Sequence, residues 1–259
     1  MKIDLNADLG EGFGPWPMGD DDALMEVISS ANIACGFHAG DPLIMVKTVA
    51  RAKARGVDIG AHVGFPDLQG FGRRQMQIDA AELAAMVTYQ LGALAGIAQA
   101  QGVRVTHMSF HGALGNMAAA DANLADPLIA AVAAFDPNLL IVSSTSTAIE
   151  GAAAKHGLRV ATTFLADRAY TDEGLLVPRS LPGAVIHDTA TVLERVKRLL
   201  VEGIVITHSG AKLKTSAQSV LVHGDSPGAV DLARTVKVAI KDAGGSVVPI
   251  SRIMGSGVP

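Results

Sequence analysis

Short apolar runs of β-forming residues alternate with longer segments of helical periodicity along most of the chain. The apolar runs predict strands at residues 2–8, 32–37, 58–63, 107–111, 139–143, 158–164, 204–207, 220–223 and 246–250. The helical segments predict helices at residues 21–30, 42–55, 80–101, 122–134, 148–155, 189–202 and 227–243. Because strand and helix alternate, the pattern predicts an α/β fold built on a parallel sheet.

The spacing of these elements favours a closed barrel. Residues that favour helix ends mark the predicted boundaries, such as the start at Asp41-Pro42 and the end at Gly56. No linker rich in Pro, Gly or Ser divides the chain, so we expect a single domain over residues 1–259. Open doubly wound sheets share the alternation, but about seven repeats in a chain of barrel size favour a β/α barrel.

Composition excludes several classes of protein. Of the 259 residues, 49% are apolar and 18% are charged, so the chain can bury a large core. The net charge of −4 and the lack of a basic stripe argue against nucleic-acid binding. The single cysteine, Cys35, cannot form an internal disulfide, and its apolar context indicates a small core residue.

One segment is long and uncharged enough to be considered as a membrane-spanning helix. Residues 83–100 carry no charged side chain, but they include Thr88, Gln90 and Gln99 and are rich in alanine. We therefore interpret the segment as a helix packed between neighbours and expect no membrane association. The N-terminal residues lack the apolar core of a signal peptide, so we expect a cytoplasmic protein.

Polar residues gather where the predicted strands end, usually beside glycine. The first strand delivers Asn6, Asp8 and Glu11, the second His38 and Asp41, the third His62, the fourth His111 and Asn116, the sixth Asp167, Arg168 and Tyr170, and a late strand His223 and Asp225. A parallel barrel brings these ends to one face, where its active sites are built. The pattern therefore predicts a site on that face.

Individual members also have structural interpretations. Asp41 can cap the following helix, and Asp167 and Arg168 can form a surface pair of little consequence. Three further histidines are interpreted as ordinary, partly exposed residues outside the site: His107, His156 and His187.

The chemistry of this face has two interpretations. Asp8, His62 and His111 form a set that divalent metals accept, with an open position for an activated water. The same residues can equally serve as acids, bases and hydrogen-bond donors around a polar substrate. The sequence has no Walker loop, no G-x-S-x-G elbow and no dinucleotide fingerprint, since residue 15 of "GEGFGP" is proline.

Eight motifs occur in order along the chain: "KIDLNADLGEGFG", "SANIACGFHAGDP", "GAHVGFPD", "FGRR", "FHGAL", "ADRAY", "VPRS" and "VHGD". Together they resemble the LamB/YcsF family, which includes the A subunit of the bacterial ATP-dependent 5-oxoprolinase. The resemblance implies a seven-stranded parallel β/α barrel similar to the glycoside hydrolase/polysaccharide deacetylase fold. It also implies hydrolysis of 5-oxo-L-proline to L-glutamate with ATP, by a chain that needs two partners, the 5-oxoprolinase subunits B and C.

The resemblance further suggests roles for the polar residues. Asp8, Glu11, His62 and His111 are the expected catalytic groups around the reacting carbon. Asp8, His62 and His111 are also the expected ligands of Mg²⁺ or another divalent metal. Substrate or phosphate is expected to be bound by Asn6, His38, Asp41, Arg73, Asn116, Asp167, Arg168, Tyr170, His223 and Asp225.

The fourth-strand motif departs from the pattern of the family, which usually reads Lys-Pro-His-Gly-Ala-Leu. Ser109 and Phe110 replace the Lys and Pro, and Gly115 stands where Tyr is common. Serine cannot supply the charge of a lysine, so a lactam other than 5-oxo-L-proline is an alternative substrate. Two alternatives also stay open: a metal-dependent deacetylase or amidase that needs no ATP, and a non-catalytic subunit that binds partners.

Overall fold

The strands form a closed parallel barrel in the computed structural model, which describes residues 1–144, 147–226 and 228–255. Its seven strands are β1 (Lys2–Leu9), β2 (Ser30–Ala34), β3 (Asp58–Val63), β4 (His107–Phe110), β5 (Leu140–Ser143), β6 (Arg159–Leu165) and β9 (Ser219–Val222). Neighbours in this order pair in parallel, and β9 also pairs with β1, which closes the barrel. The predicted seven-stranded β/α barrel is confirmed.

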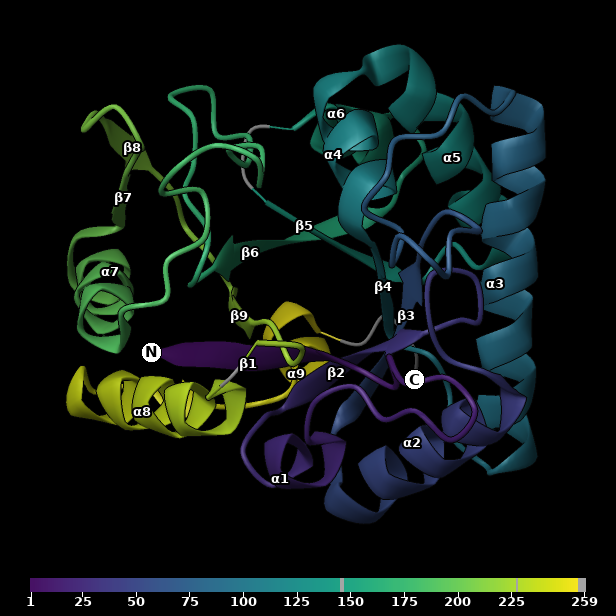
Figure 1. Cartoon of the computed structure of the whole chain (residues 1–259), viewed down its shortest axis with the longest axis horizontal. Coiled ribbons are helices and arrows are strands. Elements are labelled where there is room, and N and C mark those ends of the chain that lie inside the picture. Colours follow the sequence, from purple (N-terminus) through teal and green to yellow (C-terminus); the bar gives the residue numbers. More distant parts are fainter. Residues whose placement is uncertain (145–146, 227, 256–259) are drawn as a thin grey trace.

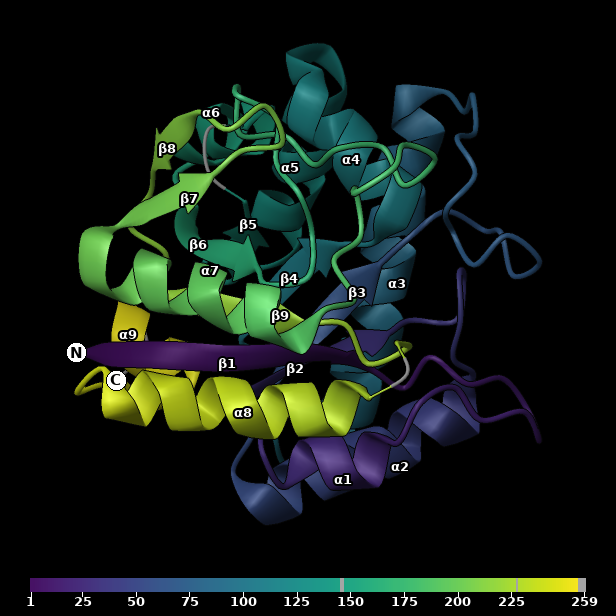
Figure 2. The same ribbon diagram turned by 60° about the vertical axis from the view of Figure 1, so that its left-hand side comes forward.

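Helices surround the strands (Figure 1). They are α1 (Asp21–Met25), α2 (Pro42–Arg55), α3 (Ala80–Ala100), α4 (Gly112–Ala120), α5 (Ala122–Phe135), α6 (Ala148–Lys155), α7 (Thr189–Glu202), α8 (Ala229–Asp242) and α9 (Ile250–Met254). Figure 2 shows α8 running along β1 and α7 packed beside α8, with the loops that follow the strands at the opposite end from the N-terminus. Those loops and the last residues of the strands carry most of the polar residues that the sequence predicts for the site.

The end of the barrel opposite those loops is closed by a buried carboxylate. Asp4 accepts hydrogen bonds from the hydroxyls of Ser29 (2.7 Å), Ser30 (2.6 Å) and Ser219 (2.6 Å). These bonds connect β1 to the start of β2 and to β9. Burial raises the pKa of Asp4 to about 6, although the three hydroxyls oppose that rise. This network holds together β1, β2 and β9 at one end of the barrel, and the predicted site lies at the other end.

Some elements differ from their predictions. The helix predicted at 21–30 ends at Met25, because Val27 and Ile28 turn into the core before β2 begins. Helix α4 was not predicted, since its Gly112 and Gly115 weaken the helical pattern. The strand predicted at 246–250 is limited to β10 (Ser246–Val247), and Ile250 begins α9.

The strand predicted at 204–207 exists but lies outside the barrel. It forms β7 (Ile204–Ile206), which pairs antiparallel with β8 (Lys212–Lys214). Helix α8 follows its prediction, although the first residue of the predicted range, 227, lies outside the described residues.

Among the described residues, helix α3 is long and apolar enough to cross a membrane. Helices α4 and α5 reach that length and apolarity only when the bent pair is counted as one segment. Core helices of soluble proteins share these properties. Helix α3 packs against α5, α2 and β3. Its Gln90 side chain is fully buried, accepts the N–H of Gly64 and donates to its carbonyl, both at 3.0 Å. These contacts agree with a helix packed within the barrel's outer layer.

Candidate active site

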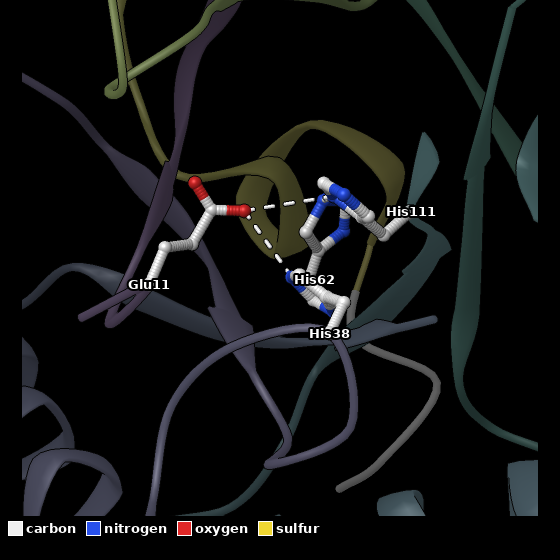
Figure 3. A group of neighbouring side chains, drawn as sticks. All are labelled: Glu11, His38, His62 and His111. Atoms are coloured by element: carbon white, nitrogen blue, oxygen red, sulfur yellow. Dashed lines mark hydrogen bonds and ion pairs between the residues drawn. The ribbon is translucent and has the colours of Figure 1, made fainter. Parts of the chain in front are cut away.

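Four polar side chains meet at the mouth of the barrel, where the first four strands end (Figure 3). Glu11 lies two residues after β1, His38 lies beyond β2, His62 is near the end of β3, and His111 follows β4 directly. Gly10 adopts a φ of +68°, so the chain turns sharply after β1 before Glu11. The glycines beside the acidic residues of "NADLGEG" therefore serve a tight turn that places a carboxylate in the site.

The four side chains form a compact, buried cluster. One potential ligand atom from each residue lies within 4.8 Å of those of the other three. Glu11 Oε1 is 3.2 Å from His38 Nε2 and 3.5 Å from His111 Nδ1. His111 Nδ1 is also 2.9 Å from His62 Nε2. The arrangement aims three imidazoles and one carboxylate at a shared point.

An aromatic contact supports the cluster from the side. The ring of Phe71 meets the rings of His38 and His111 edge to face. The backbone carbonyl of Phe71 accepts the Nε2–H of His111 at 2.8 Å. Gly72 has a φ of +62°, and a Cβ there would lie 2.7 Å from the His38 Cβ and 2.8 Å from His111 Cδ2. Residue 72 therefore needs to be glycine for the two histidines to fit.

Asp8 lies beside the cluster and anchors a hydrogen-bonded network. Its Oδ2 is 3.5 Å from His62 Nε2, and its Oδ1 accepts from Asn32 Nδ2 at 2.8 Å. Asn32 Oδ1 in turn contacts Asn6 Nδ2 at 3.4 Å and His107 Nε2 at 3.1 Å. Asp8 therefore contacts the cluster directly at His62, and Asn6 is connected to it through Asn32 and Asp8.

The interpretation of His107 as a partly exposed residue is wrong. Its side chain is fully buried inside the barrel, where Gly60 on β3 leaves room for the ring. Burial lowers the pKa of His107 to about 4, so the ring is neutral at physiological pH. His156 is half-buried against Asp126 and His187 is exposed, as expected for residues outside the site.

The two carboxylates have opposite ionisation tendencies. Burial raises the pKa of Glu11 well above its usual value, and the charges of Asp8 and Asp225 raise it further. Burial also opposes ionisation of Asp8, but His62 outweighs it and holds the pKa of Asp8 well below its usual range. Neighbouring carboxylates with pKa values driven apart are a common basis for acid–base chemistry.

The two stacked histidines favour their neutral forms. Burial lowers the pKa of His38 well below its ordinary value, and the charges of His62 and Arg73 act in the same direction. Burial followed by repulsion from His38 and His62 lowers the pKa of His111 in the same way. Neutral imidazoles keep a free lone pair, which both metal binding and proton acceptance require.

Two ion pairs lie near the cluster. Arg73 donates to Asp225 Oδ2 at 2.7 Å and places its guanidinium 4.8 Å from the centre of the Phe71 ring. His223 Nδ1 lies 2.8 Å from Asp167 Oδ1. Burial alone would raise the pKa of Asp167, but the charge of His223 lowers it. These pairs join the segments that follow β3, β6 and β9.

Four predicted site residues have other positions or partners. Asp41 caps α2 by accepting from Leu43 and Ile44, and its other oxygen accepts from Gly14. Asn116 is exposed on α4. The guanidinium of Arg168 donates to the carbonyls of Ala184 and Val177, which fixes the loop after β6. Tyr170 is buried in the core, and its hydroxyl accepts the N–H of Leu165.

Sequence reasoning missed three residues that contact or face the site. Ser109 contacts His62 Nδ1 at 2.7 Å, and Phe71 supports two of the histidines. The charge of Arg179, within the "VPRS" motif, interacts with those of Arg73 and Asp225. The signal for Phe71 and Arg179 was their presence in short motifs, whereas nothing local marks Ser109 as a partner of a histidine.

Comparison with known proteins assigns the sequence to a family. The sequence profile of the LamB/YcsF family matches residues 3–255. The chain belongs to the LamB/YcsF family. The resemblance drawn from the motifs is therefore confirmed.

Three known proteins are similar to this chain over nearly its whole length. The chain is 68% identical over 255 residues to a 5-oxoprolinase A subunit of Ralstonia nicotianae, covering 98% of each chain. It is 66% identical to a 5-oxoprolinase A subunit of Pseudomonas syringae pv. tomato, over 99% of this chain and 100% of that one. The crystal structure of a lactam utilization protein from Thermus thermophilus superposes with a TM-score of 0.90 at 42% identity, covering 96% of this chain and 100% of that one.

The donor set of this LamB/YcsF barrel fits a divalent metal ion. Three imidazole nitrogens and one carboxylate oxygen form a combination that Zn²⁺ and related metals accept. The set shares His62 and His111 with the ligands predicted from sequence. Its carboxylate is Glu11 and its third imidazole is His38, while Asp8 lies next to His62. Glu11 and His38 are therefore candidates for metal binding as well as for direct chemistry.

Proposed function

We propose that this chain is the A subunit of a cytoplasmic, ATP-dependent 5-oxoprolinase that hydrolyses 5-oxo-L-proline to L-glutamate together with subunits B and C. The names of the relatives support this proposal, since two proteins at 66% identity or more are named as A subunits of 5-oxoprolinase. The similar Thermus thermophilus structure, named a lactam utilization protein, supports a cyclic amide as the substrate.

The observation that carries the proposal is the pair of unlike carboxylates at the barrel mouth. Amide hydrolysis adds a water oxygen to the carbonyl carbon, breaks the C–N bond and delivers a proton to the leaving nitrogen. Glu11, whose pKa is raised by burial and by Asp8, can carry that proton. Asp8 stays ionised and lies 3.5 Å from His62 Nε2, so this pair can accept a proton from the water.

ATP would overcome the low reactivity of the lactam. Transfer of the γ-phosphoryl group to the lactam oxygen makes the ring carbon electron-poor, so that water can add to it. Protonation of the nitrogen and cleavage of the C–N bond then give an acyl phosphate, which a second water hydrolyses to the carboxylate and phosphate. Arg73 and Arg179 are the candidate cations for the phosphate or the substrate carboxylate, because their charges interact near Asp225. Carboxylates of the site are candidates for binding the Mg²⁺ that accompanies the nucleotide.

The cluster of Glu11, His38, His62 and His111 favours a second candidate function. This is a metal-dependent amidase or deacetylase that needs no ATP. A bound metal ion would polarise the carbonyl and lower the pKa of a water molecule. In that case the three imidazoles and Glu11 hold the ion, and Asp8 remains the free carboxylate beside His62.

The assembled enzyme distinguishes these functions. Release of glutamate and ADP is measured with 5-oxo-L-proline and MgATP, using this chain with and without subunits B and C. Coupled release that needs all three subunits supports the proposal. Amide hydrolysis without ATP supports the second candidate. No turnover by a folded complex that binds the substrate contradicts both and favours a non-catalytic subunit.

A further inference from the structure

Ser109 contacts a cluster histidine from the next strand of the barrel. Ser109 on β4 is the register partner of His62 on β3, so both side chains lie on the same face of the sheet. The Ser109 Oγ is 2.7 Å from His62 Nδ1, and both residues are buried. This contact reaches the ring nitrogen that faces away from His111.

The contacts run from the Phe71 carbonyl through His111 and His62 to Ser109, and the carbonyl sets the direction of each hydrogen bond. The carbonyl of Phe71 can only accept, so His111 Nε2 carries the proton of that bond. In a neutral His111 the Nδ1 then has a lone pair, and His62 Nε2–H donates to it across 2.9 Å. When His62 is neutral, its Nδ1 then has a free lone pair, which accepts the hydroxyl proton of Ser109.

Along this chain of contacts, the position unsuited to metal binding is His62 Nε2. The Nδ1 of His111 already has a lone pair, held there by the Phe71 carbonyl. The Nε2 of His62 carries a proton, and a protonated ring nitrogen cannot bind a cation. Metal binding through this atom requires the proton of His62 to lie on Nδ1. The hydrogen bond between the two residues then reverses: His62 Nδ1–H donates and the Ser109 hydroxyl oxygen accepts.

We propose that Ser109 is a positioning residue whose hydroxyl changes from donor to acceptor and so permits the tautomer of His62 that binds a divalent cation. The inference rests on the metal-dependent candidate function above. A hydroxyl can both donate and accept, whereas an alanine does neither and a lysine ammonium only donates. Hydrogen-bond partners of ligating histidines set ligand tautomer and basicity, and their loss typically costs roughly 10- to 100-fold in metal affinity.

Metal binding by the isolated full-length chain tests this role without any measurement of activity. Affinities for Zn²⁺ and Co²⁺ are measured by competition and by the visible absorption of bound Co²⁺. Ser109→Ala is expected to lower both affinities roughly 10- to 100-fold, whereas Ser109→Thr, which keeps the hydroxyl, stays within about threefold of the parent chain. Ser143→Ala is the matched control, because Ser143 is a buried serine on β5 that contacts Thr147 instead.

A second measurement reads the tautomer directly. Nitrogen-15 chemical shifts of the metal-free chain are expected to show His62 protonated at Nε2, and those of the Zn²⁺-loaded chain to show the proton at Nδ1. The proposal is overturned by a proton on Nδ1 in the metal-free chain, or by Ser109→Ala binding Co²⁺ as tightly as the parent. It is also overturned if the parent chain binds neither metal, an outcome that leaves the ATP-dependent function standing.

Discussion

The imidazole of His38 lies flat against that of His111, with ring centroids 3.7 Å apart and planes inclined by 5°. Two cationic rings would repel each other strongly at this separation, and burial adds to that cost. The stack therefore holds both rings neutral while it aims His38 Nε2 and His111 Nδ1 at Glu11 Oε1. The relationship couples the shape of the cluster to its protonation state.

Replacing His38 by phenylalanine separates shape from chemistry. His38→Phe keeps a flat ring against His111 and Phe71 but removes the nitrogen that contacts Glu11. We expect the thermal midpoint to change little and the rate of glutamate formation by the assembled enzyme to fall by about 100-fold or more, the factor typical of a lost acid–base group. His156→Phe is the control. A rate close to that of the parent would show that the His38 nitrogen is not needed.

The buried His107 predicts a dependence of stability on pH. Its pKa is lowered from 6.5 to about 4 in the folded chain, so below pH 6.5 the unfolded chain binds a proton that the folded chain does not. Stability is therefore lost as the pH falls from 6.5 toward 4. Between about pH 7 and about pH 5.5, His107→Gln should lose about 1 kcal/mol less unfolding free energy than the parent chain in urea titrations. Equal losses in the two chains would contradict this assignment.

The ion pair of Arg73 and Asp225 predicts coupled effects on substrate binding. The pair joins the loop after β3 to the segment after β9, and Arg73 also covers the Phe71 ring. Arg73→Gln and Asp225→Asn should each raise the KM for 5-oxo-L-proline by about tenfold, and the double variant should resemble the worse single variant. Arg234→Gln, which affects an exposed helical pair, provides the control. Fully additive effects would show that the two residues act independently.

The barrel and the strand-end histidines could be predicted from the sequence for one physical reason. Parallel strands direct their carboxyl ends to the same face, so His38, His62 and His111 had to meet once the strand order was known. Which carboxylate joins them could not be predicted. Asp8 and Glu11 are close in the sequence, and only the turn at Gly10 decides that Glu11 reaches His38 and His111 while Asp8 faces His62 and Asn32.

Other differences depend on partners distant in the sequence. His107 is accommodated in the interior because Gly60, far earlier in the chain, has no side chain at the register position opposite it. Arg168 follows a strand as predicted, but its guanidinium is held by the carbonyls of Val177 and Ala184 from the loop after it. A residue type at a strand end thus predicts proximity to the mouth, whereas its hydrogen-bond partners depend on loops without a periodic pattern.

The central claim is that the lactam reacts at the buried cluster around Glu11. The most direct measurement compares the parent chain, Glu11→Gln and Glu26→Gln, each assembled with subunits B and C, in release of glutamate and ADP from 5-oxo-L-proline and MgATP. Glutamine keeps the size of Glu11 but can neither bear its charge nor give up its proton, whereas Glu26 only pairs with Arg55 on the surface. We expect Glu11→Gln to lose about 100-fold or more in glutamate release, as other lost acid–base groups do, and Glu26→Gln to keep the parent rate. Full activity of a folded Glu11→Gln complex would contradict the account.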